Sequence, residues 1–209
     1  MFKQITTAPL AASVLMSSSA VMANDWFVGA TLGSSDHDIK ADGGNGQFKD
    51  SYTGLRAGTF INDNIRLYAN LGRIKGSDKA DIEPGVQMDQ SINNEELSFS
   101  VDYIDNLFQL ESTKYFVGGT LGYNRMKVDI DVKELGITVD KASKKDSGAL
   151  YGVQLGLIQE FTPAISAELG YRYIHMDNKV KLEFTDPADT MKLKQKDQQM
   201  VYINVSYQF

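Results

Sequence analysis

Apolar and polar residues alternate along the last ten residues of the chain. Counting back from Phe209, every second residue is apolar or aromatic, namely Tyr207, Val205, Ile203 and Val201. The residues between them are mostly polar. A period of two residues places the apolar side chains on one face of a β-strand. The sequence therefore predicts a strand with one face in an apolar environment, and it predicts that this strand is the last structural element.

The same alternation recurs in seven further segments. They span about residues 26–33, 51–61, 65–73, 97–106, 115–126, 149–161 and 165–175. Most of the spacers between strands are either clearly short or clearly long. The short spacers are 62–64 and 162–163, and the long ones are 34–50, 75–96, 127–148 and 177–197. The boundary between the fourth and fifth strands, within 107–114, is the least sharply marked.

This arrangement predicts a barrel that crosses a membrane. An even number of strands, with short turns at one end and long polar loops at the other, is typical of such barrels. Each apolar stretch is close to the length of about nine to eleven residues that a tilted strand needs to cross a bilayer. We predict an all-β fold, an eight-stranded antiparallel up-and-down transmembrane β-barrel. A soluble lipocalin-like barrel would keep most hairpins short and turn its apolar face inward.

Two of the long spacers continue the alternation of apolar and charged residues, at about 128–139 and 179–193. We predict that these segments are hairpins that extend their strands beyond the membrane. An exposed sheet edge there would allow a partner to add a strand. A solvated loop with local sheet is the alternative.

The first 23 residues have the pattern of a secretory signal peptide. Lys3 gives a positive start, 8–16 is mostly small and apolar, and small residues lead up to Ala23. The segment is too short and too weakly apolar to span a bilayer. We predict a cleaved signal peptide, 1–23, followed by one barrel domain, 24–209. An ordinary N-terminal helix is the alternative for the first segment.

Composition excludes some classes of function. The formal net charge of -6 at pH 7, without a basic stripe, argues against a nucleic-acid partner. The chain has no cysteine, so an exported form holds together without disulfides. Several of its 18 glycines lie within the strand-like segments. Glycine suits the crowded inner wall of a small barrel.

If the apolar faces contact lipid, the opposite faces line the barrel interior. Eight strands leave room there for side chains but not for an open channel. Charges in so narrow a space must pair, because an isolated buried ion costs several kcal/mol. We predict an internal salt-bridge cluster of Arg56, Asp102, Glu168 and Arg172. Structural filling of the interior is favoured over a gating or conducting role.

Aromatic residues fall near the two predicted membrane interfaces, as in the girdles of membrane barrels. The aromatic residues at the short-turn rim are Trp26, Tyr115, Phe161 and Phe209. Those toward the long-loop rim are Tyr123, Tyr171 and Tyr173. Arg73 and the lysines of the last long spacer are placed to meet lipid phosphates. A merely solvated face explains these cations equally well.

The sequence offers little for catalysis. It contains two histidines, His37 and His175. His37 lies among acidic residues in the first long spacer, which is a weak metal signal. Nucleophile–base pairs in positions typical of enzymes are absent from the pattern. We expect no enzyme activity, no metal site and no cofactor.

Four features together resemble the small eight-stranded outer-membrane barrels. This group includes the OmpA transmembrane domain and the OmpX/Ail-like proteins, often described as porin-family outer-membrane proteins. The features are the signal peptide, the opening Trp26-Phe27-Val28-Gly29, the pair Tyr123-Asn124 and the closing Tyr207-Gln208-Phe209. The resemblance implies insertion by the outer-membrane assembly machinery, which would read Phe209, Tyr207, Val205 and Ile203. Asn204 departs from the family pattern, in which glycine is frequent at that position.

The resemblance and the pattern together predict a monomer in the cell outer membrane, exported by a cleaved signal peptide. We expect a structural or surface-interaction role, including adhesion, through long extracellular loops, and an interior plugged by charged side chains. The expected partners are outer-membrane lipid and lipopolysaccharide, the assembly machinery and, through the loops, a host or surface ligand. The alternatives are a small-solute or ion pore and a periplasmic lipocalin-like binding barrel.

Overall fold

The computed structural model describes residues 26–41, 44–83, 86–108, 110–134, 137–183 and 190–209. The predicted signal peptide, 1–23, lies outside the described residues. The described residues form the strands β1 (Trp26–Ala41), β2 (Gly44–Asn62), β3 (Ile65–Glu83), β4 (Val86–Leu107), β5 (Leu110–Glu134), β6 (Ile137–Glu160), β7 (Ile165–Glu183) and β8 (Thr190–Gln208). The described part of the chain contains no helix that is long and apolar enough to cross a membrane.

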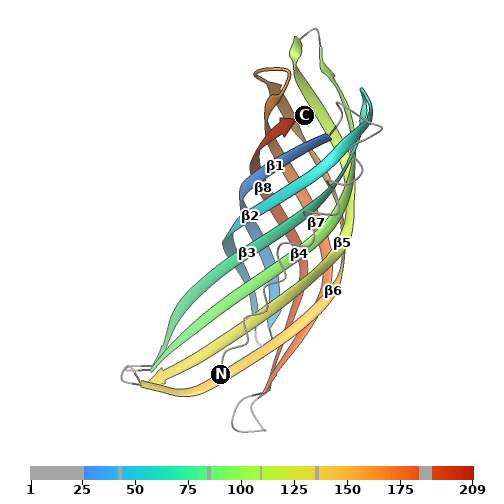
Figure 1. Cartoon of the computed structure of the whole chain (residues 1–209). Coiled ribbons are helices and arrows are strands. Elements are labelled where there is room, and N and C mark those ends of the chain that lie inside the picture. Colours follow the sequence, from blue (N-terminus) through green and yellow to red (C-terminus); the bar gives the residue numbers. More distant parts are fainter. Residues whose placement is uncertain (1–25, 42–43, 84–85, 109, 135–136, 184–189) are drawn as a thin grey trace, which may run out of the picture.

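Each strand pairs antiparallel with the next, and β1 also pairs with β8, so that the sheet closes into a barrel (Figure 1). The predicted eight-stranded antiparallel up-and-down barrel is confirmed. The cylinder is long, and its two ends differ. Short turns join β2 to β3, β4 to β5 and β6 to β7 at one end, where the C-terminus also lies. We call this the short-turn end, and we call the opposite end the hairpin end.

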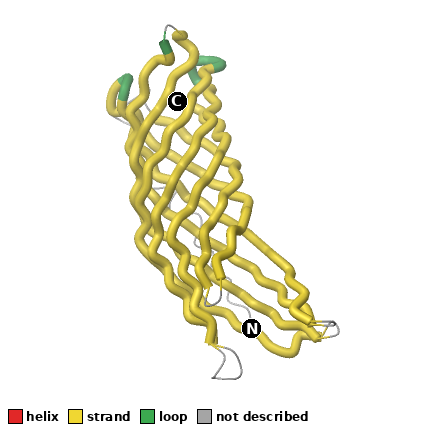
Figure 2. Tube along the Cα trace, turned by 180° about the vertical axis from the view of Figure 1, so that it is seen from behind, coloured by secondary structure: helices red, strands yellow, loops and turns green. Residues whose placement is uncertain are grey.

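The strands continue past their predicted limits at the hairpin end. β5, which we expected over 115–126, runs for 25 residues, and β6 runs for 24. Most of the expected long loops are therefore paired strand (Figure 2). The ladder continues there whether or not the side chains alternate strictly, because its hydrogen bonds join main-chain groups. The predicted continuation of the strands is confirmed where the residues are described, since 128–134 pairs with 137–144 and 179–183 pairs with 190–194. Residues 135–136 and 184–189 of these predicted hairpins lie outside the described residues.

Beyond the middle of the barrel, the sheet divides into two. The pairing of β6 with β7 reaches Leu150 and Met176, and that of β2 with β3 reaches Ser51 and Lys75. Farther out, β3, β4, β5 and β6 stay paired as one sheet, and β7, β8, β1 and β2 as another. Among the described residues, the outer segments 137–149 of β6 and 76–83 of β3 pair with a strand on one side only. We call the two sheets the outer sheets.

The outside of the barrel midsection is apolar and its inside is polar. Val117, Leu155 and Ile203 point outward and are 50, 54 and 58% exposed, whereas the inward Gln154 and Asn204 are buried. We call this outer surface the apolar belt. Its other members include Leu32, Leu55, Leu71, Phe99, Val101, Leu121, Val153, Leu169, Val201 and Val205. The predicted orientation, with apolar faces outward and charged faces enclosed, is confirmed.

Two adjacent glycines of β5 show how tightly the inner wall is packed. A Cβ atom on the inward Gly118 would overlap Asp102 Oδ1 and the carbonyl oxygen of Val101. A Cβ atom on the outward Gly119 would have its nearest neighbour, the carbonyl oxygen of Gly152, at 3.8 Å. The absence of a side chain is therefore required at Gly118 and not at Gly119.

We expect the Gly118→Ala variant to lose about 1–3 kcal/mol of its free energy of unfolding, because the added methyl group overpacks the interior. Urea titration of the refolded barrel in lipid vesicles measures this loss. The Gly119→Ala variant is the matched control and is expected to stay close to the wild type. Equal stability of the two variants would contradict the close packing at Asp102.

Candidate functional site: the barrel interior

Four charged side chains from four strands meet inside the barrel, and we call them the central network. They are Arg56 of β2, Arg66 of β3, Asp102 of β4 and Glu168 of β7. Their sequence neighbours belong to the outward face, so alternation turns all four inward. Arg66 and Asp102 are also partners in the ladder between β3 and β4. Each of the four residues is at most 4% exposed.

Arg66 connects both acids of the central network. Its Nε donates to Asp102 Oδ2 at 2.9 Å, and its Nη1 and Nη2 donate to Glu168 Oε1 and Oε2 at 2.6 and 3.0 Å. Arg56 Nη2 forms an ion pair with Glu168 Oε1 at 2.6 Å. Two-pronged contacts between arginine and carboxylate are among the strongest in proteins. Glu168 is therefore shared by two arginines and holds the network together.

Neutral and aromatic groups complete the surroundings of the central network. Gln154 Nε2 donates to Asp102 Oδ1 at 2.6 Å and to Tyr68 Oη at 2.5 Å. The guanidinium carbon of Arg66 lies 5.0, 5.2 and 5.7 Å from the ring centres of Tyr68, Phe116 and Phe27. Such cation–π contacts are strongest where water is excluded. The charges are thus held by paired groups and ring faces.

Arg172 lies in a separate ion pair, nearer the hairpin end. Its Nη2 donates to Glu96 Oε1 at 2.5 Å, and Tyr52 Oη donates to the same oxygen at 3.1 Å. The predicted cluster is therefore divided: Arg56, Asp102 and Glu168 come together through Arg66, and Arg172 does not join them. Glu96 was assigned to a long spacer, although its place two residues before the inward Ser98 signals an inward position.

The inward face of β4 gives the order of layers along the barrel axis. From the short-turn end it runs Ile104, Asp102, Ser100, Ser98, Glu96, Asn94 and Ile92, and all of these are buried. Between the two ionic layers, Ser100 Oγ donates to Thr120 Oγ1 at 3.0 Å, and Asn70 Nδ2 donates to Ser100 Oγ at 3.2 Å. Apolar residues close both sides, with Phe116 and Ile158 packed near Ile104 and a cluster of Leu150, Ile174 and Met176 farther out.

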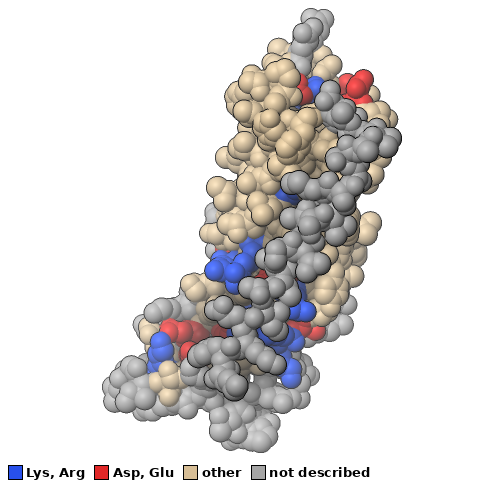
Figure 3. Space-filling view, in the orientation of Figure 1, with Lys and Arg blue, Asp and Glu red and all other residues tan. Residues whose placement is uncertain are grey.

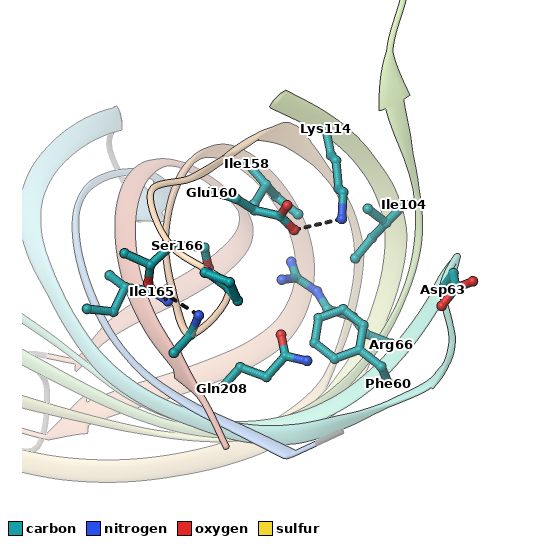
Figure 4. A pocket seen from close by; sticks show the side chains of 13 residues that line it. Phe60, Asp63, Arg66, Ile104, Lys114, Ile158, Glu160, Ile165, Ser166 and Gln208 are labelled. Carbon is teal, nitrogen blue, oxygen red and sulfur yellow. Dashed lines mark hydrogen bonds and ion pairs between the residues drawn. The ribbon is translucent and has the colours of Figure 1, made fainter. Parts of the chain in front are cut away.

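A small pocket opens at the short-turn end (Figure 4). Its walls include Phe60, Ile104 and Ile158, and Arg66 extends toward it. At its edge, Lys114 Nζ pairs with Glu160 Oε1 at 2.6 Å. The volume of about 40 Å³ is room for a few water molecules, each of which needs about 10–15 Å³ on this measure. The pocket therefore ends against the central network.

The predicted girdle and terminal residues lie at the two edges of the apolar belt. Phe161 and Phe209 are exposed at the short-turn end, where Trp26 and Tyr115 are half-buried. The outward-facing aromatic residues toward the hairpin end include the predicted Tyr123, Tyr171 and Tyr173, and also Tyr151. The amide of Phe209 donates to the carbonyl oxygen of Trp26 at 2.9 Å, which completes the contact between β8 and β1.

One pair of a histidine and an aspartate lies outside the barrel interior. His175 Nδ1 lies 2.7 Å from Asp197 Oδ1, across the ladder between β7 and β8, and the ring packs against Tyr151 with 5.2 Å between the ring centres. The side chain of His37 lies outside the described part of the structure. Among the described residues, no three His, Asp or Glu side chains come close enough together to hold a metal ion.

The model of a family described as outer membrane protein beta-barrel domain matches residues 8–209. The chain belongs to this family. Among curated proteins, none matches the sequence.

Solved structures of outer-membrane barrels share the fold of this family member. Neisserial surface protein A matches with a TM-score of 0.61 at 18% identity, over 88% of this chain and 97% of that one. Ail, the attachment invasion locus protein of Yersinia pestis, matches with a TM-score of 0.52 at 15% identity, over 88% of this chain and 98% of that one. OprG from Pseudomonas aeruginosa matches with a TM-score of 0.51 at 16% identity, over 90% of this chain and 96% of that one. Membership of the family implies an outer-membrane location.

Proposed function

We propose that this outer-membrane barrel is a closed, monomeric protein that serves envelope structure and surface interaction through its two outer sheets. One observation carries the closed interior: the central network and the Arg172–Glu96 pair fill the lumen in successive layers. Three arginines meet three carboxylates in these layers, so their charges balance without mobile ions. The interior of an eight-stranded barrel is just wide enough for side chains to fill, which leaves no open channel beside them.

The length of the strands supports a role at the cell surface. At about 3.4 Å per residue, the 25 residues of β5 would measure about 85 Å, against a hydrocarbon core of about 30 Å. Even when tilted, the outer sheets project well beyond the lipid. In the outer sheet formed by β3 to β6, the edge segments on β3 and β6 offer backbone groups to a partner strand, which is one way in which sheets bind extended peptides. We propose that the predicted signal peptide directs export and is then cleaved.

Conductance tests the closed interior. We expect the purified barrel in a planar lipid bilayer to give no large, long-lived channel openings, because ions would have to cross two paired ionic layers and the apolar layers around them. Swelling of protein-containing liposomes in small sugars should match that of protein-free liposomes. Steady conductance or rapid swelling would favour the small-solute pore and overturn the closed interior.

We also propose that Phe209, Tyr207, Val205 and Ile203 form the signal read by the assembly machinery. The Phe209→Ala variant is expected to reach the outer membrane at a level several-fold below the wild type, measured as heat-modifiable protein in the membrane fraction. Phe161→Ala removes a similarly exposed rim aromatic from the turn after β6 and should leave assembly unchanged. Unchanged abundance of Phe209→Ala would contradict the proposed signal.

A further inference from the structure

A group of basic side chains lies outside the barrel, just beyond the apolar belt at the hairpin end. On β3, the outward series continues from Leu71 to Arg73 and Lys75; β5 and β6 contribute Arg125, Lys127 and Lys145. We call Arg73, Lys75, Arg125, Lys127 and Lys145 the cationic patch. Figure 3 shows Lys and Arg side chains gathered between the broad tan surface and the hairpin end.

The strand register brings these cations together. Arg73 and Arg125 are both ladder partners of Glu95, one on each side of β4, and Lys127 is the direct partner of Lys145. Neighbouring strands are about 4.8 Å apart, so the patch spans about 15 Å across β3 to β6. Five cations therefore fall within the footprint of one lipid headgroup that carries more than one phosphate.

Among the described residues, the five cations of the patch share this surface with two carboxylates, Glu95 and Asp129, so the patch keeps a net positive charge. Lys127 pairs with Asp129 at 2.6 Å, and Arg73 bonds the neutral Asn93. Within the described residues, Lys75, Arg125 and Lys145 form no ion pair. Like charges placed directly opposite each other across two strands, as Lys127 and Lys145 are, destabilise a sheet. A bound anion would relieve this repulsion.

The other half of the same rim has a different character. At the outward positions just beyond the belt on β7, β8, β1 and β2, the described side chains include no Lys or Arg. They are His175, Asp197, Gln199, Ser34, Asp36, Ser51 and Thr53. Among the described side chains of this rim, the positive charge therefore lies on β3, β5 and β6.

We infer that the cationic patch binds the phosphate groups of a phosphorylated glycolipid of the outer leaflet, the chemistry of lipopolysaccharide. The patch begins one outward position past Leu71 and Tyr123, which is the level at which headgroup phosphates meet the apolar belt. A lipid whose acyl chains lie beside the belt already holds its phosphates at the level of the patch, so binding requires little additional loss of orientational entropy. The inference rests on the proposed outer-membrane orientation, with the hairpin end outside.

The test measures binding of purified lipopolysaccharide to the refolded barrel in neutral detergent, with a chelator present to remove bridging divalent cations. The wild type should bind intact lipopolysaccharide at least about tenfold more tightly than the dephosphorylated form at low salt, and high salt should reduce the difference. The double variant Arg125→Gln with Lys145→Gln should bind the intact form about thirtyfold more weakly, since each basic residue at a membrane surface contributes about a fivefold factor.

The matched control is Lys114→Gln with Lys133→Gln, which also removes two cations. Lys114 and Lys133 are paired with Glu160 and Asp89 and lie outside the patch. This control should bind like the wild type, and both double variants should keep heat-modifiable migration because all four sites are on the surface. Equal binding of the two forms of glycolipid, or equal loss in both double variants, would overturn the inference. A barrel that inserts and does not conduct would still support the proposed function.

Discussion

Replacement of Glu168 by alanine is expected to lower the free energy of unfolding by about 3–5 kcal/mol, because it leaves buried charge without a partner. Arg56 loses its ion pair, and Arg66 keeps only Asp102. Both guanidinium groups are shielded from bulk water, since both residues are at most 4% exposed. The loss is measured by unfolding the barrel from lipid vesicles in urea and monitoring the folded fraction by its gel mobility.

Two further variants separate charge balance from the loss of a contact. Glu160→Ala breaks the exposed pair with Lys114 and should cost less than about 1 kcal/mol. The double variant Arg56→Met with Glu168→Ala leaves Arg66 and Asp102 as a balanced pair, so it should be more stable than Glu168→Ala alone. A loss for Glu168→Ala no larger than that for Glu160→Ala would show that the network is not held together by this carboxylate.

A lysine in the middle of the apolar belt is expected to cost about 2–4 kcal/mol of unfolding free energy, because the charge would face hydrocarbon. Ile203 is suitable because it points outward from β8 and is 58% exposed on the barrel surface. The measurement is the same urea titration of the Ile203→Lys variant in vesicles. In short-chain detergent micelles, which let water reach the belt more easily, the loss should be smaller.

Gln199→Lys provides the control on the same strand. Gln199 also points outward but lies two pairs of residues nearer the hairpin end, past Val201. The substitution removes one exposed hydrogen bond from Tyr171 and should change stability by less than about 1 kcal/mol. Comparable losses for Ile203→Lys and Gln199→Lys would mean that the belt does not face lipid.

The fold could be predicted from the sequence because membrane contact imposes a simple pattern. Every outward residue of the midsection must be apolar and every inward one must fit a narrow lumen, so alternation marks strand, face and limits together. At the short-turn end, the expected starts of β3 and β7 at Ile65 and Ile165 coincide with the observed ones. The hairpin end lacks this constraint, and the strands there run beyond the limits that the pattern indicated.

The interior was harder to predict, because alternation tells which residues point inward but not which ones meet. Contacts across the lumen depend on the stagger of all the strands around the barrel. Arg66 was recognisable as inward from its apolar neighbours Ile65 and Leu67, yet only the ladder places it beside Asp102. Arg172 has the same inward signal, but it lies one ionic layer farther out, next to Glu96.

The central network joins parts of the chain that are synthesised far apart. Arg56, Arg66 and Asp102 arrive on consecutive strands, whereas Glu168 follows Arg66 by 102 residues. In a partial sheet that ends before β7, the layer of Arg56 and Arg66 has only Asp102 as a carboxylate, and Glu96 of the next layer lacks Arg172. β7 brings both Glu168 and Arg172, so its arrival completes the ion pairs of both layers and favours the closed ring over incomplete intermediates.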